Sequence, residues 1–132
     1  MTDTPMVPVS WGELLDKITI LQIKTERMDD AAKRANVVTE LTLLSEIAHK
    51  ALVDAAALTA DLKTVNETLW EVEDKIRDKE LAQAFDAEFI ALARAVYVTN
   101  DRRAELKRQI NRLLGSRLVE EKSYKPYIAE AK

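Results

Sequence analysis

The feature that most constrains this chain is a run from residue 37 to residue 76 that contains neither glycine nor proline. Apolar or small residues recur along it at alternating steps of four and three. This heptad spacing is typical of a long helix with one face packed against other helices. As one helix, the run would be about 60 Å long. The seam consists of Val37, Leu41, Leu44, Ala48, Ala51, Ala55, Leu58, Leu62, Val65, Leu69, Val72 and Ile76.

The composition agrees with a helical protein of one domain. Of the 132 residues, 33% are charged and 5% are aromatic, and there are only two glycines and three prolines. This profile favours a helical bundle over a β-sandwich or an α/β sheet, and the length favours a single domain. We therefore predict an all-α fold, an antiparallel bundle of three long helices with coiled-coil-like packing.

Charge, cysteine content and hydropathy limit the possible functions. The net charge of −3 gives no general attraction to nucleic acid or to acidic membranes. The chain has no cysteine, which excludes disulfides, thiol catalysis and cysteine-bound zinc. No apolar stretch is long enough to span a bilayer, and the N-terminus lacks the pattern of a signal peptide. We expect a cytoplasmic protein that binds no nucleic acid, no membrane and no cofactor.

The N-terminal half is expected to contain a capped helix, a turn and a second, longer helix. Ser10 is a good N-cap and forms a capping-box pattern with Glu13. The first helix should then cover residues 11–33. The apolar seam shifts phase near Asn36, which indicates a turn with Asn36 as the cap of the next helix. A break at residues 59–61 would divide the second helix and give a bundle of four helices.

The C-terminal half is expected to contain one more turn, the third helix and a tail. A second phase shift predicts the turn within residues 78–84. The next seam begins at Phe85 and reaches Leu113, and Gly115 should end the helix in a left-handed conformation. Pro126 argues against a long helix in the tail, which we expect to pack back on the bundle. The expected organisation is a flexible lead-in (1–9), a helical bundle (10–115) and an extended tail (116–132).

Arg103 occupies a seam position of the third helix where a coiled coil favours leucine. A buried guanidinium needs a carboxylate partner or contact with water. In a hairpin that turns near residue 82, Arg103 would lie level with Asp61, which is therefore the candidate partner. If this pair is purely structural, we expect Arg103→Met to keep the fold. The alternative is that Arg103 contacts a ligand.

Two other patterns resemble metal sites, but neither is complete. Glu67, Glu71 and Asp74 share a helical face and could bind a hard cation such as Mg²⁺. A solvated face with neighbouring basic residues is the simpler interpretation. Glu46 and His49 make one Glu-x-x-His motif, whereas a di-iron bundle needs two. We therefore predict no metal site and interpret His49 as a surface residue.

Four stretches of the chain together resemble a known family. They are residues 9–24, residues 65–74, residues 97–104 with Lys107 and Asn111, and residues 120–124. The family consists of short, all-helical bacterial proteins catalogued as a domain of unknown function, so the resemblance implies no reaction. It does direct attention to polar residues in the shared stretches as candidates for a polar network or a ligand site: Asp16, Lys17, Lys24, Asn66, Glu73, Asp74, Asn100, Asp101, Arg102 and Arg103.

Two classes of function follow from these observations. The first is a non-enzymatic interaction or assembly module, because the surface is rich in heptads and no motif completes a known chemistry. An unbroken second helix would leave apolar seam uncovered at its ends, which favours a homodimer; another protein partner is also possible. The second class is a protein that binds a small anionic ligand, or an enzyme acting on one. A concave pocket lined by several of the polar residues would favour this second class.

Overall fold

The computed structural model describes residues 4–128; the outer ends of the predicted lead-in and tail, residues 1–3 and 129–132, lie outside this range. Over that range, helices are the only regular secondary structure. The prediction of an all-α fold is therefore confirmed, although the described chain has five helices and not three or four. They are α1 (Trp11–Arg27), α2 (Ala31–Ile47), α3 (His49–Asp54), α4 (Ala56–Leu81) and α5 (Ala87–Leu114).

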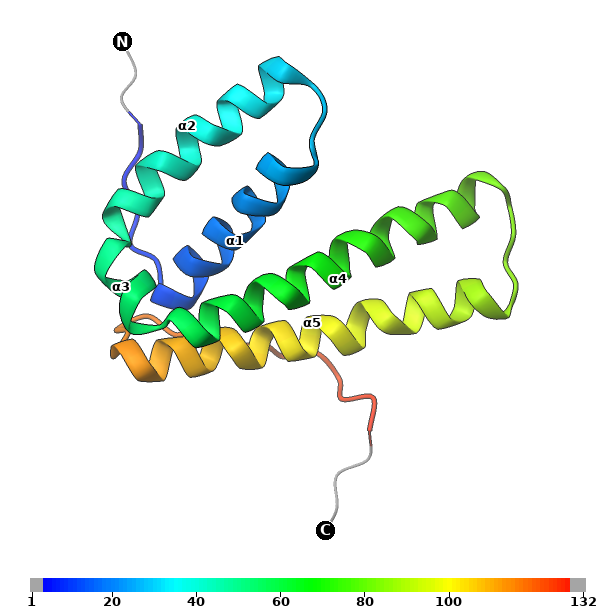
Figure 1. Ribbon diagram of the computed structural model, residues 1–132. Helices are drawn as coiled ribbons and strands as arrows, with labels where there is room; N and C mark the ends of the chain where they lie inside the picture. The colour runs from blue at the N-terminus through cyan, green and yellow to red at the C-terminus, as the bar shows by residue number, and fades with distance from the viewer. Residues whose placement is uncertain (1–3, 129–132) are drawn as a thin grey trace.

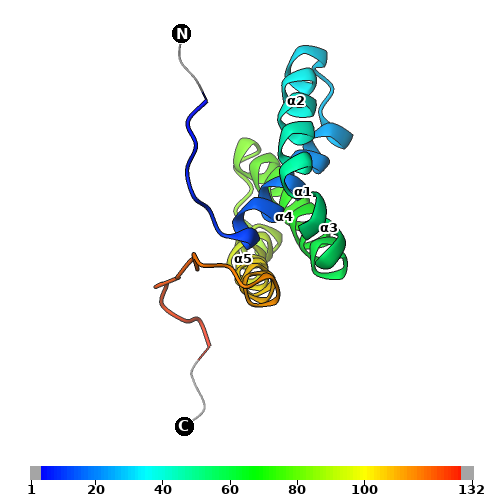
Figure 2. The ribbon, with the colours of Figure 1, turned by 90° about the vertical axis from the view of Figure 1, so that its left-hand side faces the viewer.

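The helices form two hairpins that diverge from one end of the molecule (Figure 1). One hairpin is α1–α2, the other is α4–α5, and the short helix α3 connects them. Helix α1 is central because it packs against α2, α4 and α5. The core lies where the hairpins meet, and its buried apolar residues include Leu15, Ile18, Leu62, Leu106 and Ile110. Figure 2 shows the lead-in and the tail on the side opposite α2 and α3.

The first helix is shorter than predicted. It ends at Arg27, and Met28 adopts an extended conformation with ψ 133°. Asp30 then caps α2 by accepting a hydrogen bond from the backbone N–H of Lys33 at 2.9 Å. The turn therefore precedes the predicted one, and Asn36 lies inside α2 and not at its cap.

The long helix predicted for residues 37–76 is divided at Ala48 and Ala55, and not at residues 59–61. Both alanines leave the helical conformation, with φ/ψ of −92°/7° and −113°/32°. They are fully or almost fully buried, at 0% and 2% exposure. Because their side chains are small, the chain can bend at both points while it stays close to the core. Thr59 lies within α4, where its hydroxyl donates to the carbonyl of Ala55 at 2.7 Å.

The remaining boundaries are close to those predicted. The hairpin turn comes slightly later, because α4 ends at Leu81 and Asp86 caps α5 through the backbone N–H of Phe89 at 3.0 Å. Gly115 ends α5 in the left-handed conformation, with φ 63°, as predicted. The predicted seam of α5 is correct only near the core, since Leu113 is 58% exposed. Residues 116–128 form no helix and no strand.

Candidate functional site

The start of α1 is held against α5 by its cap and by a glycine. The Ser10 hydroxyl accepts a hydrogen bond from the backbone N–H of Glu13 at 3.1 Å, as predicted. The backbone N–H of Gly12 donates to Oδ1 of Asn111 at 2.7 Å. A Cβ atom on Gly12 would lie only 2.5 Å from the backbone oxygen of Lys107. The absence of a side chain at Gly12 therefore permits the close contact of the two helices.

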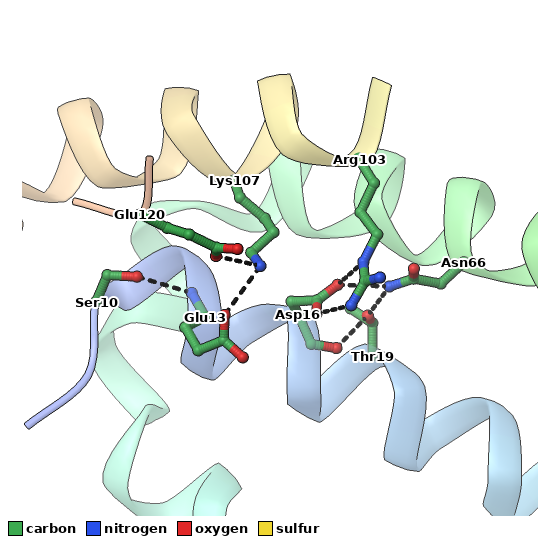
Figure 3. A network of polar contacts seen from close by, with 8 residues as sticks. All are labelled: Ser10, Glu13, Asp16, Thr19, Asn66, Arg103, Lys107 and Glu120. Carbon is green, nitrogen blue, oxygen red and sulfur yellow. Dashed lines mark hydrogen bonds and ion pairs between the residues drawn. The ribbon is translucent and has the colours of Figure 1, made fainter. Parts of the chain in front are cut away.

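One turn further along α1, Asp16 forms a buried ion pair with Arg103 of α5 (Figure 3). Asp16 is 1% exposed as a residue, and its carboxylate accepts hydrogen bonds from Nε of Arg103 at 2.9 Å and from Nη2. The hydrogen bonds that Arg103 donates to Asp16 are the main reason why the pKa of Arg103 is raised. The predicted partner, Asp61, is exposed on α4. The prediction was wrong because it considered only the α4–α5 hairpin, whereas the partner comes from α1.

Asn66 of α4 completes this network. Its Nδ2 atom donates to Oδ1 of Asp16 and to Oγ1 of Thr19, both at 2.9 Å. Thr19 in turn donates to the backbone oxygen of Asp16 at 2.7 Å. Among residues 4–128, no buried side-chain nitrogen or oxygen lacks a hydrogen-bond partner. The network therefore joins α1, α4 and α5 without leaving a fully buried side-chain nitrogen or oxygen atom unpaired.

A second ion-pair cluster lies one turn along α5, at Lys107. Its Nζ atom donates to Glu13 at 2.9 Å and to Glu120 of the tail at 2.6 Å (Figure 3). Burial by itself lowers the pKa of Lys107, but the hydrogen bonds to Glu120 and Glu13 outweigh it, so the pKa is raised. The bond from Lys107 also lowers the pKa of Glu120. Because Glu13 pairs with Lys107, it does not make the return bond of the predicted capping box.

The tail follows α5 and encloses a cleft. Lys122 pairs with Asp101, and the ring of Tyr127 lies 5.1 Å from that of Tyr97, centroid to centroid. The predicted packing of the tail against the helices therefore holds for these residues. The cleft between the tail and α5 has a volume of about 830 Å³, and Arg103 is one of the residues that line it.

The attachment of the tail should weaken in acid. The pKa of Glu120 is lower in the attached state than in a free chain, so its carboxylate favours attachment at neutral pH and loses this effect as the pH falls through the lowered value. We expect residues 116–128 to be less protected from hydrogen exchange, after correction for intrinsic rates, when the pH is below the ordinary pKa of a glutamate side chain. In Glu120→Gln, the protection should be weak already at neutral pH, without the acid step. An equally strong acid step in this variant would show that Glu120 is not responsible.

A second cleft lies between α1, α4 and α5, and its volume is about 520 Å³. The network of Asp16 lies beside it, because Asn66 and Arg103 belong to both. Trp70 and Leu69 of α4 and Ile20 and Ile23 of α1 provide its apolar lining. Its polar lining includes five of the residues predicted from the sequence: Asn66, Glu73, Asp74, Asn100 and Arg103. A concave site of this kind is what the ligand-binding alternative requires.

The other predicted residues lie apart from this cleft. Lys17 forms an exposed ion pair with Glu40 of α2 at 3.0 Å. Asp101 contacts the tail through Lys122. Lys24 and Arg102 form no side-chain hydrogen bond or ion pair with any residue from 4 to 128. Asp16 lies behind the cleft, where it orients Arg103 and Asn66.

The candidate set from the sequence lacks several residues of the two clusters. Gly12 and Thr19 lie in the family-like stretch of residues 9–24, but a glycine and a threonine there carry no charge to single them out, and their roles depend on contacts with other helices. Glu13 was assigned a role as a capping residue, and its ion pair with Lys107 could not be foreseen from helical spacing. Lys107 and Glu120 lie in the stretches that resemble the family, and this signal could have identified them.

Within the described part of the chain, no three histidine, aspartate or glutamate residues are grouped so that they could hold a metal ion. No helix there has the length and apolar character needed to cross a membrane.

Comparisons with known proteins place the chain in a family. The model of a family described as "Family of unknown function (DUF6165)" matches residues 6–131. Comparisons with curated proteins and with solved structures gave no match. Because the family model covers nearly the whole sequence, the chain belongs to the family of unknown function DUF6165.

Proposed function

We propose that this chain is a non-enzymatic helical assembly module that forms a homodimer through the free end of the α4–α5 hairpin. We refer to residues 76–96 as the distal arm. One observation carries the proposal: no residue between Glu73 and Glu105 is buried. Helix α1 ends near Glu71, which its last residue, Arg27, contacts at 3.4 Å. Beyond this point the two helices of the hairpin continue without a third helix beside them (Figure 1).

The distal arm exposes large apolar side chains. Leu81 is 86% exposed, Phe85 55% and Ile90 58%. Full burial of one such side chain is worth about 1.5–3 kcal/mol. A partner that covers all three would therefore stabilise the complex substantially. These three residues lie outside the seam predicted for residues 37–76, so the support for self-association comes from a different apolar surface than the one that the sequence suggested.

A second copy of the chain fits this surface in charge and in symmetry. The distal arm has three basic and four acidic residues, so two arms repel each other only weakly. Lys79 is already paired within the arm, with Asp86 and Glu88, each at 3.0 Å. Two hairpins related by a two-fold axis would cover each other's apolar residues in a four-helix arrangement with coiled-coil-like packing.

Phe85→Asp should convert the dimer to a monomer, because the charge would have to be buried in the interface without a partner. Sedimentation velocity on the wild-type protein and on this variant, at equal micromolar concentrations, measures the change. Phe85 is more than half exposed in the isolated subunit, so its replacement should not unfold the subunit. The helix content measured by circular dichroism should therefore not change.

Val53→Asp is the matched control. Val53 is also apolar and is 67% exposed, but it lies on α3, away from the distal arm. This variant should sediment like the wild-type dimer. If both variants remain dimeric, the interface lies elsewhere, and if both become monomeric, the effect is not specific to the arm.

A further inference from the structure

One face of α4 supplies most of the wall of the cleft between α1, α4 and α5. Asn66, Trp70, Glu73, Asp74 and Arg77 follow one another at steps that keep them on the same side of a helix. All five line the cleft. The cleft therefore combines an aromatic ring, an amide and charged groups on a single rigid element.

The amide of Asn66 has a fixed orientation in this cleft. Its Nδ2 atom must point toward Asp16, because an ionised carboxylate only accepts hydrogen bonds. The oxygen Oδ1 is consequently turned away from Asp16 (Figure 3), and it accepts no hydrogen bond from any residue between 4 and 128. Asn66 is only 5% exposed and lines the cleft. It therefore offers a nearly buried acceptor to a molecule in the cleft.

The charges of the cleft leave one carboxylate in surplus. Arg103 is neutralised by Asp16, and Arg77 is paired with Glu73 at 3.6 Å. Asp74 forms no ion pair with the residues that the structure describes. An anionic ligand, the alternative suggested by the sequence, would find both arginines already paired and an unpaired carboxylate nearby. The arrangement favours a cation.

We propose that this cleft binds a small aliphatic compound with a primary ammonium group. One N–H of the ammonium group can donate to the oxygen of Asn66, while the carboxylate of Asp74, two helical turns or about 12 Å further along α4, attracts the cation by its charge alone. The face of Trp70 attracts a cation, and Leu69, Ile20 and Ile23 can contact the aliphatic part. Arg77 is the one residue that the cleft lining shares with the distal arm; the groups proposed to hold the ligand lie outside the arm, so the proposal goes beyond the assembly function.

The experiment is a titration of the full-length protein with n-butylammonium chloride, followed by thermal unfolding and by calorimetry. We expect a saturable rise in melting temperature that sodium chloride at equal ionic strength does not produce. Sodium succinate and sodium phosphate should resemble sodium chloride. Tetramethylammonium chloride should bind more weakly than n-butylammonium, because it has no N–H group to donate to Asn66.

Variants separate this site from general charge effects. Trp70→Leu should weaken the binding of n-butylammonium roughly tenfold, and Asp74→Asn should weaken it roughly threefold, through the loss of a longer-range attraction. Asp61→Asn should bind like the wild type, since Asp61 is an exposed carboxylate of the same helix that neither lines the cleft nor belongs to the distal arm. Equal affinity in Asp74→Asn and the wild type would overturn the proposal. So would saturable binding of phosphate or succinate in place of n-butylammonium.

Discussion

Arg103→Met should destabilise the protein by about 3–5 kcal/mol, the usual cost of removing one member of a buried ion pair. Asp16 is 1% exposed, so its carboxylate would remain in the core with only the amide of Asn66 as a side-chain donor. The free energy of unfolding, from urea denaturation at neutral pH, measures the loss. The expectation from the sequence, that this substitution keeps the fold, presumed a different partner for Arg103.

Two control variants isolate the cause. In the double variant Asp16→Leu with Arg103→Met, both charges are replaced by apolar side chains, and most of the lost stability should return. Asp61→Ala should change stability by less than about 0.5 kcal/mol, because Asp61 is an exposed residue. A large loss in Asp61→Ala together with a small loss in Arg103→Met would contradict the observed pairing.

Gly12→Ala should destabilise the protein by about 1–3 kcal/mol through overpacking between α1 and α5. The new Cβ would lie 2.5 Å from the backbone oxygen of Lys107, and backbone cannot move aside as easily as a side chain can. Intrinsic helix propensity acts in the opposite direction, since alanine favours a helix over glycine by about 1 kcal/mol. The sign of the change in unfolding free energy therefore decides between the two effects.

Gly115→Ala provides the comparison for Gly12→Ala. No atom lies within 4 Å of a Cβ placed on Gly115, so only its left-handed conformation, with φ 63°, opposes the substitution. We expect a loss of roughly 1–2 kcal/mol from this conformational strain alone. A gain of stability in Gly12→Ala would show that α1 and α5 are further apart than described here.

The features that the sequence predicted correctly are mostly local ones. Ser10 and Gly115 could be identified as caps because capping depends on a few neighbouring residues. The heptad pattern correctly identified buried positions such as Leu62, but not the path of the backbone. Ala48 and Ala55 interrupt the run although alanine is the best helix former, because tertiary packing decides the bend.

The candidate site depends on contacts between distant segments, and these were only partly predictable. Helical spacing placed Arg103 in a seam, but the register of the α4–α5 hairpin alone could not identify Asp16 of α1 as its partner. The resemblance to the family did include Asp16, Asn66 and Arg103 among the candidate residues. The pair of Lys107 and Glu120 required the path of the tail, which no periodic pattern defines.

The molar mass of the wild-type protein in solution tests the central claim, that the distal arms of two copies pair, most directly. Static light scattering over a series of micromolar concentrations gives this mass without assumptions about shape. We predict a value that rises with concentration to twice the monomer mass of 14.9 kDa. A mass that stays at 14.9 kDa at every concentration would contradict the proposed assembly function.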